Sequence, residues 1–214
     1  YPVIHGSNTD YINLMKFIKS NDLSLDQNYS YINDKIDLEN FVNYYSVQIF
    51  FANYDWPIHN IKIWRKNNSK WRYVLYDLDG GFTGNGSGRD HTLDMFSRLS
   101  NQDECVGCGN TPEATVLFRG LMKNDKFRDR FLHKYQEITY QYMEPEITLA
   151  IVDSVADIYR SNMQSHINRW RYPWSLHHHW QRDIEKHVKD FLIHRPTTTL
   201  NNLKKYINER GYDN

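Results

Sequence analysis

Four polar residues in the stretch 53–82 have types and spacings that suit phosphoryl transfer. Asp55 lies five residues before Asn60, and Asp77 and Asp79 follow two apolar segments further along the chain. Phosphoryl transfer requires a carboxylate that orients or deprotonates the acceptor hydroxyl, and oxygen ligands that hold Mg²⁺ on the nucleotide phosphates. Carboxylate and amide oxygens are the ligands that Mg²⁺ prefers in proteins. The pattern therefore supplies both kinds of group.

A β-hairpin is predicted between Asn60 and Asp77. Residues 61–66 and 71–76 are rich in Ile, Trp, Tyr and Val, which favour strands. The turn-prone residues 67–70 separate these segments. The hairpin is the element that must position the polar residues on either side of it.

The register of this hairpin decides which polar residues meet. If Lys66 lies opposite Trp71, antiparallel pairing also sets Asn60 opposite Asp77, with Cα atoms about 4.5 to 5.5 Å apart. Asp55, five residues before Asn60, reaches the same volume from the preceding loop. We therefore predict a small pocket with one amide and two carboxylates.

A purely structural role is the alternative for these residues. Asp55 would start a turn with Pro57, Asn60 would end it, and Asp77 and Asp79 would be ordinary loop carboxylates. Against this, the pattern has the order found in protein kinases: a catalytic Asp, a metal-binding Asn five residues later, a hairpin, and a second metal-binding Asp. The glycine-rich residues that follow also offer flexible backbone where a phosphate can approach.

Helices are predicted on both sides of the hairpin, so the predicted fold class is mainly α (α+β). Apolar residues at helical spacing mark residues 10–20, 38–52, 111–121, 127–142, 147–170, 176–191 and 200–207. Asp37 and Thr111 are candidate N-caps. Pro173 and Pro196 are expected to interrupt the helices near the C-terminus.

Two polar stretches are predicted to lack regular structure. Residues 21–35 are expected to form a connector, and residues 80–110, with seven glycines, are expected to form a long loop. The predicted organisation is a partial segment or connector over residues 1–36 and one helical domain over residues 37–210.

Composition limits the classes of partner. Lys plus Arg and Asp plus Glu both number 26, so no overall charge favours nucleic acid or an anionic membrane, although a local patch is compatible with this balance. No apolar run has the length of a membrane span, and the first residues do not resemble a signal peptide. The chain begins with Tyr1 rather than Met, which suggests a processed form or a fragment.

The remaining candidate sites have structural interpretations. Cys105 and Cys108 form one Cys-x-x-Cys, and two free loop thiols or a local disulfide explain them better than zinc or redox chemistry. Residues 177–179 are three consecutive histidines, which point in different directions on a helix and are expected at the surface. The aromatic residues of the hairpin are expected to pack on a neighbouring helix or lobe, with a sugar-binding platform as the alternative.

The amino-acid sequences of several segments resemble the CotH (spore-coat protein H-like) kinase family of atypical protein kinases. The resemblance covers residues 36–195 and is most specific in DWPIHN and YDLD; TVLFRGLMKNDKFRDRF and HINRW extend it. It implies a protein-kinase-like C-lobe, ATP with Mg²⁺ (or Mn²⁺), and phosphorylation of Ser or Thr on a secreted, cell-surface or spore-coat protein. The resemblance implies that Asp55 is the catalytic base and that Asn60 and Asp77 bind the metal ion and its nucleotide. Asp79 is the alternative to Asp77 as metal ligand.

One part of the kinase pattern is missing. About 36 residues precede the matching helix, and they contain neither a glycine-rich strand pair nor a lysine on a strand. We therefore expect that the N-lobe was removed from this sequence and that the chain alone binds ATP poorly. The alternative function is a catalytically silent kinase-like module that binds protein or carbohydrate at a cell surface.

Overall fold

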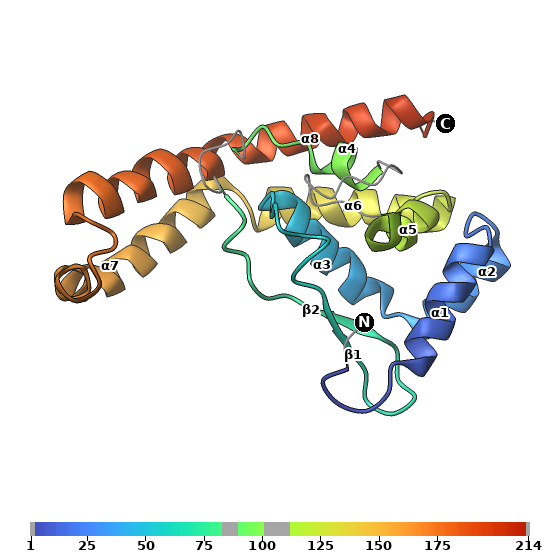
Figure 1. The fold of residues 1–214 in the computed structure, drawn as a ribbon. Coiled ribbons are helices and arrows are strands. Elements are labelled where there is room, and N and C mark those ends of the chain that lie inside the picture. Colours follow the sequence, from blue (N-terminus) through green and yellow to red (C-terminus); the bar gives the residue numbers. More distant parts are fainter. Residues whose placement is uncertain (1–2, 83–89, 101–111, 213–214) are drawn as a thin grey trace. The chain divides into compact units, whose positions relative to one another are not determined.

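The computed structural model describes residues 3–82, 90–100 and 112–212 (Figure 1). The predictions for Cys105, Cys108 and Thr111 concern positions outside these residues. None of the described helices is long and apolar enough to cross a membrane.

The described residues are mainly helical and contain one two-stranded sheet, which confirms the predicted fold class. The helices are α1 (Thr9–Ser20), α2 (Asp26–Lys35), α3 (Leu38–Phe50), α4 (Met95–Ser100), α5 (Pro112–Leu121), α6 (Asp125–Gln141), α7 (Pro145–Trp170) and α8 (Asp190–Arg210). Two π-helical turns, η3 (Leu176–Gln181) and η4 (Ile184–Lys189), precede α8, and the strands are β1 (Lys62–Trp64) and β2 (Arg72–Val74).

The elements divide into two compact units, and each is described by itself. Unit 1 comprises Tyr1–Tyr45, Asp55–Tyr76 and Arg98–Tyr135, and unit 2 comprises Ser46–Tyr54, Asp77–Ser97 and Gln136–Asn214. The boundaries predicted at residues 36–37 stay a prediction.

Unit 1 has an aromatic core centred on α3. Tyr45 stacks on Phe118 with ring centroids 5.2 Å apart and stacks on Phe41 at 4.2 Å. Phe118 in turn contacts the ring of Phe131 on α6 at 5.3 Å. All four side chains are buried, and aromatic pairs of this kind add stabilisation beyond their buried area.

Asp37 caps α3, as predicted. Its carboxylate accepts a hydrogen bond from the backbone N–H of Asn40 (3.1 Å) and one from Arg72 Nε (2.9 Å). Burial raises the pKa of Asp37, but these hydrogen bonds from Asn40 and Arg72 outweigh burial and leave the pKa below its usual range. The cap therefore also ties the start of α3 to β2.

The hairpin is present, but its predicted length and register were wrong. β1 and β2 pair Lys62 with Val74 and Trp64 with Arg72, which is one residue away from the register that would oppose Lys66 and Trp71. Extended by the same pairing, this register sets Asn60 opposite Tyr76 rather than Asp77. Each strand has three residues, where six were expected.

The segment before α3 explains the shorter ladder. Trp71 forms a parallel bridge with Ile36, and its N–H donates to the carbonyl of Lys35 (2.8 Å) while its carbonyl accepts from Asp37 N–H (2.9 Å). The turn closes through Ser69 N–H, which donates to Lys66 O (3.0 Å). Because Trp71 pairs with the segment before α3, it does not pair with Lys66.

Polar contacts order α2 inside the stretch predicted as a connector. Ile32 is fully buried, which provides one apolar anchor where a helical stripe normally has several. Asn124 Nδ2 donates to the carbonyl of Ser24 (3.0 Å), and Lys126 forms an ion pair with Asp26 (2.6 Å). Contacts with residues about a hundred positions away are invisible to local periodicity, so the connector prediction was wrong here.

The long loop predicted over residues 80–110 contains α4. Asp94 caps this helix by accepting a hydrogen bond from the N–H of Ser97 (2.9 Å). Met95 and Phe96 are buried, and the Phe96 ring stacks on Tyr206 of α8 at 5.7 Å. A six-residue helix leaves too little periodicity to be recognised among the glycines.

In unit 2, α7 lies antiparallel beside the segment formed by η3, η4 and α8 (Figure 1). Helical structure continues through Pro196, so the predicted interruption at this residue was wrong. Arg195, the residue before it, is fully buried and bonded on several sides, and these tertiary contacts outweigh the backbone hydrogen bond that proline removes.

Candidate active site

A buried aromatic anchors the loop that carries Asp55. Trp56 is fully buried, and its ring meets those of Tyr45 at 4.8 Å and Tyr44 at 6.1 Å, both edge to face. Asp55 beside it is exposed, and its carbonyl accepts a hydrogen bond from the N–H of His59 (2.9 Å). The loop thus presents a carboxylate to solvent from a rigid base.

Asn60 ends this loop in a left-handed backbone conformation. Its φ is 60°, and its carbonyl accepts a hydrogen bond from the hydroxyl of Tyr44 (3.3 Å). Asn tolerates this conformation better than most non-glycine residues, which explains the residue type at the turn into β1. Asp55 and Asn60 therefore lie on one short loop held by the same aromatic cluster of α3.

The hairpin is held against α3 by one amide side chain. Asn40 Nδ2 donates to the carbonyl of Tyr73 (3.2 Å), and its Oδ1 accepts from the N–H of Tyr73 (2.6 Å). The side chain thus replaces a neighbouring strand for the central residue of β2. The Tyr73 ring is buried, and this burial raises the pKa of its hydroxyl well above the usual value.

The basic residues of the hairpin have structural partners. Arg65 forms an ion pair with Asp10 and lies over the Trp71 ring, 4.6 Å from its centroid. Lys62 lies 4.0 Å from the centroid of the Tyr76 ring. Trp71 is buried whereas Trp64 is half exposed, so the hairpin aromatics form no continuous exposed platform for a sugar.

In unit 2, the loop that carries Asp77 and Asp79 is pinned to the end of α3. Asn53 Nδ2 donates to the carbonyl of Asp77 (3.2 Å), and Tyr54 N–H donates to the carbonyl of Gly80 (2.9 Å). These donors are the two residues that immediately precede Asp55 in the chain. Both carboxylates are exposed, so the loop is fixed through its backbone and its acidic side chains remain accessible.

The far end of this loop is equally constrained. Phe82 N–H donates to the carbonyl of Phe51 (2.8 Å), and Gly81 N–H donates to the carbonyl of Leu78 (2.9 Å). A side chain at Gly81 would place its Cβ 2.9 Å from the carbonyl oxygens of both Leu78 and Phe51. The second glycine of the Asp-Gly-Gly sequence is therefore required by close approach of two backbone segments.

Left-handed backbone concentrates around these loops. Ala52, Asn60, Asn67, Asp77 and Phe82 are five of the six non-glycine residues with positive φ among the described residues. Such conformations cost free energy and persist where the surroundings over-determine them, which is frequent at functional sites. The strain supports a functional role for the stretch predicted from the sequence.

Arg195 organises the end of α3 and was missed by sequence reasoning. It is fully buried and donates from Nε to Phe50 O and from Nη2 to Ile49 O, both at 2.7 Å. Its Nη1 donates to the carbonyls of His91 (2.7 Å) and Leu93 (2.8 Å). The positive charge lies at the negative end of the α3 dipole. No local pattern marks this arginine, because its partners lie more than a hundred residues away.

A buried amide pair also escaped prediction. Asn53 Nδ2 donates to Gln48 Oε1 (2.8 Å) as well as to Asp77, and both side chains are fully buried. Asn53 Oδ1 and Gln48 Nε2 have no hydrogen-bond partner. In the sequence, Gln48 and Asn53 flank the apolar residues at the end of α3. A buried polar side chain at such a position needs a hydrogen-bond partner from another part of the fold, so these two amides could have been recognised as candidates.

The structure places the four predicted site residues in two pairs. Asp55 and Asn60 share a loop of unit 1, and Asp77 and Asp79 share a loop of unit 2. The assembly of these pairs into one pocket stays a prediction. Within the described residues, no group of three or more His, Cys, Asp or Glu side chains is arranged to hold a metal ion.

One of the three consecutive histidines departs from the prediction. His177 and His178 are exposed, as expected, whereas the side chain of His179 is only 12% exposed. His179 contacts the carboxylate of Asp183 through Nε2 (3.1 Å).

An Asp-x₄-Asn loop, a hairpin and an Asp-x-Asp loop in a mainly helical chain follow the order of parts in kinase-like phosphotransferases. Comparison with protein families agrees with this class. The family model described as CotH kinase protein matches residues 3–212. The chain therefore belongs to the CotH kinase family. Neither a search of curated proteins nor a search of solved structures finds a match.

Proposed function

We propose that this chain is an atypical protein kinase domain that transfers the γ-phosphoryl group of ATP to a Ser or Thr hydroxyl of a secreted, cell-surface or spore-coat protein. Membership of the CotH kinase family supports the kinase class. The observation that carries the proposal is the pinned loop with two exposed carboxylates, bonded to the two residues that precede Asp55.

Asp55 acts on the acceptor in this proposal. Its exposed carboxylate accepts the proton of the substrate hydroxyl while the hydroxyl oxygen forms a bond to the γ-phosphorus. The bond from that phosphorus to the β-γ bridging oxygen breaks, and ADP leaves. The buried Trp56 keeps the carboxylate oriented, because the loop cannot move without disturbing the aromatic core.

Asn60 and Asp77 would hold the metal ion, with Asp79 as an additional ligand. An amide and two carboxylates fit Mg²⁺ or Mn²⁺, and both carboxylates are exposed on a loop whose backbone is fixed. When bound, the ion neutralises charge on the β- and γ-phosphate oxygens. The left-handed backbone at Asn60 and Asp77 fixes the directions in which these side chains leave the chain.

The test is transfer of labelled phosphate from ATP with Mg²⁺ or Mn²⁺ to the protein itself and to proteins encoded beside it. We expect Asp55→Asn to lower the rate by at least about a hundredfold, the lower end for general base catalysis. Asp77→Asn should also lower the rate, because it removes a proposed ligand of the metal ion. Asp34→Asn removes an exposed carboxylate of α2 and should leave the rate unchanged.

Two results would contradict the proposal. Absence of transfer by a preparation that contains the whole gene product would favour a silent kinase-like module that binds protein or carbohydrate. Transfer that survives both Asp55→Asn and Asp77→Asn would place the chemistry elsewhere in the molecule.

A further inference from the structure

The connection between α7 and η3 presents three aromatic side chains to solvent. Trp170, Tyr172 and Trp174 are 61%, 69% and 59% exposed. They belong to residues 169–174, which we call the aromatic tip, at the end of the antiparallel pair formed by α7 and the following helical segment (Figure 1). Exposed aromatics grouped on one turn indicate an interaction surface.

The aromatic tip is also cationic. Residues 161–181 contain Arg169 and Arg171 and no Asp or Glu, although the whole chain has equal numbers of acidic and basic residues. Arg169 lies over the Trp170 ring, 4.9 Å from its centroid. The charge of this segment therefore complements an anionic partner.

The backbone of the aromatic tip is strained. Arg171 ends α7 with a left-handed φ of 59°, and its N–H donates to the carbonyl of Ile167 (2.8 Å). Glycine is the usual residue at such a position. An arginine there carries a conformational cost, which suggests that its side chain is kept for a purpose.

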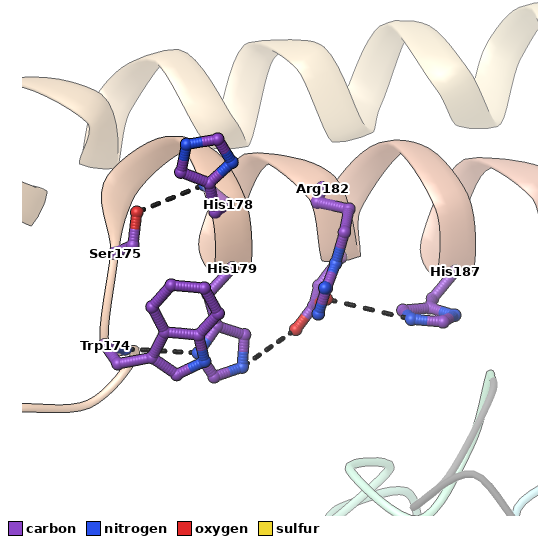
Figure 2. Close-up of polar contacts among 7 residues, drawn as sticks. Trp174, Ser175, His178, His179, Arg182 and His187 are labelled. Carbon is purple, nitrogen blue, oxygen red and sulfur yellow. Dashed lines mark hydrogen bonds and ion pairs between the residues drawn. The ribbon is translucent and has the colours of Figure 1, made fainter.

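A hydrogen-bonded bracket holds the tip in shape (Figure 2). The N–H of Trp174 donates to His179 Nδ1 (3.1 Å), so the proton of this imidazole lies on Nε2, which faces Asp183 (3.1 Å). The His179 ring also contacts the rings of Tyr172 at 5.1 Å and Trp174 at 5.4 Å. Asp183 is held from its other side by Arg182 (3.0 Å). The exposed aromatics are therefore organised before any partner arrives.

The size of the aromatic tip discriminates between kinds of partner. Three aromatic side chains of about 150 to 250 Å² each, exposed by about three fifths, offer roughly 300 to 450 Å². A stable protein interface needs about 800 Å² from each partner. A bilayer needs no such area, because amphipathic Trp and Tyr rings enter the headgroup layer singly while arginines pair with lipid phosphates.

We propose that the aromatic tip is a peripheral docking site for anionic lipid bilayers, in which Trp170, Tyr172 and Trp174 enter the headgroup layer and Arg169 and Arg171 contact lipid phosphates. His179 is a positioning residue, since it orders two of the rings without reaching the lipid itself. This inference is independent of the proposed kinase activity.

The test is flotation of the full chain with vesicles of phosphatidylcholine and phosphatidylglycerol in equal parts, compared with phosphatidylcholine alone. We expect binding to the mixed vesicles that falls as salt rises. Arg169→Gln with Arg171→Gln should weaken it by roughly thirtyfold, about fivefold for each cation removed. Replacing Trp170, Tyr172 and Trp174 together by Ala should abolish it.

Matched variants keep the test specific. Tyr140→Ala with Tyr142→Ala removes two aromatics that are 59% and 58% exposed elsewhere in unit 2, and should leave binding unchanged. Lys66→Gln with Lys70→Gln removes two exposed cations from the hairpin turn and should also have no effect. Circular dichroism confirms that each variant is folded.

Three outcomes would overturn the proposal. The first is failure of the folded protein to float with the mixed vesicles. The second is equal loss of binding in the control variants. The third is binding that depends on the aromatic tip but is directed to soluble polyglutamate or heparin and not to vesicles, which would identify an acidic polymer as the partner.

The variant His179→Ala tests the positioning role of this residue, because it retains the arginines and the three aromatic side chains of the tip. It should weaken vesicle binding and leave the salt dependence of binding unchanged.

Discussion

Arg195 shows how one buried side chain can hold the backbone of a candidate active site. Its guanidinium bonds four carbonyls, and two of them end the helix that leads into Asn53 and Asp55. Replacement by Met keeps apolar volume but leaves those carbonyls without a donor. We expect Arg195→Met to lower the free energy of unfolding by about 3 kcal/mol or more, at about 1–3 kcal/mol for each orphaned buried group.

Urea denaturation measures this change. Arg195→Lys keeps the charge but cannot present several donors in a planar fork, so its loss should be smaller but still clear. Arg130→Met alters an exposed arginine of α6 and should change the free energy of unfolding by no more than about 0.5 kcal/mol. Equal effects at positions 195 and 130 would show that the carbonyl contacts contribute little.

The placement of Asp55 and Asn60 on one loop was predictable from the sequence because the two residues lie close together in the chain. Asp55 and Asn60 are five positions apart, and one loop suffices to place both. Asn53, Gln48 and Arg195 were not predictable, since each acts through a buried contact to backbone or side chain from another segment. Residues that touch a substrate tend to show in a motif, whereas residues that position them do not.

The loop that follows β2 is the element on which the acidic pair depends, and Gly81 is its tightest point. A Cβ at this position would lie 2.9 Å from two backbone oxygens, which cannot move without shifting the loop or the end of α3. We expect Gly81→Ala to lower the free energy of unfolding by about 1–3 kcal/mol, the range for overpacked interiors. Amide hydrogen exchange should accelerate at Tyr54 and Phe82, whose N–H groups bond across this loop.

Gly120→Ala provides a matched comparison. There the added Cβ would lie 2.9 Å from Leu23 Cδ1, the end of a side chain that can rotate away. Alanine also favours α5 over glycine by about 1 kcal/mol, which offsets the crowding. A loss at Gly120 as large as that at Gly81 would indicate that crowding in general, and not the backbone contact, sets the cost.

The elements themselves show where sequence periodicity is sufficient. It predicted α1, α3, α6 and α7 and the existence of the hairpin, because each has a regular apolar pattern. It failed for the register of the hairpin, where the bridge between Trp71 and Ile36 competes with the pairing that turn length implied. A shift of one residue in register moves every side chain of a strand to the opposite face of the sheet. A predicted register is therefore correct only if the assumed length of the turn is correct.

Proline rules failed at Pro196 for a related reason. Two π-helical turns precede α8, and helical structure passes through the proline although it removes one backbone hydrogen bond. Arg195 supplies four hydrogen bonds one residue earlier, and these outweigh the loss. Local propensity is a weak guide wherever a fully buried charge fixes the backbone.

At the scale of the whole molecule, the proposed chemistry requires both units. The proposed catalytic base and one proposed metal ligand are in unit 1, and the acidic pair is in unit 2. The two loops follow one another closely along the chain: Tyr54, bonded to Gly80 within unit 2, directly precedes Asp55 of unit 1. A ligand that uses all of these residues must therefore order two loops together.

This requirement gives a prediction for hydrogen exchange of the whole gene product with Mg²⁺ and a non-hydrolysable ATP analogue. At an analogue concentration about a hundred times the dissociation constant, binding stabilises the liganded state by about 2.7 kcal/mol. Amides that exchange only when the free protein opens should therefore exchange roughly a hundredfold more slowly. We expect this slowing at residues 55–60 and 77–82 together, and its loss from both loops in Asp77→Asn, although residues 55–60 are unaltered. Asp34→Asn should keep it in both. Protection of one loop alone, or protection of residues 55–60 that survives Asp77→Asn, would mean that the two carboxylate pairs do not serve one site.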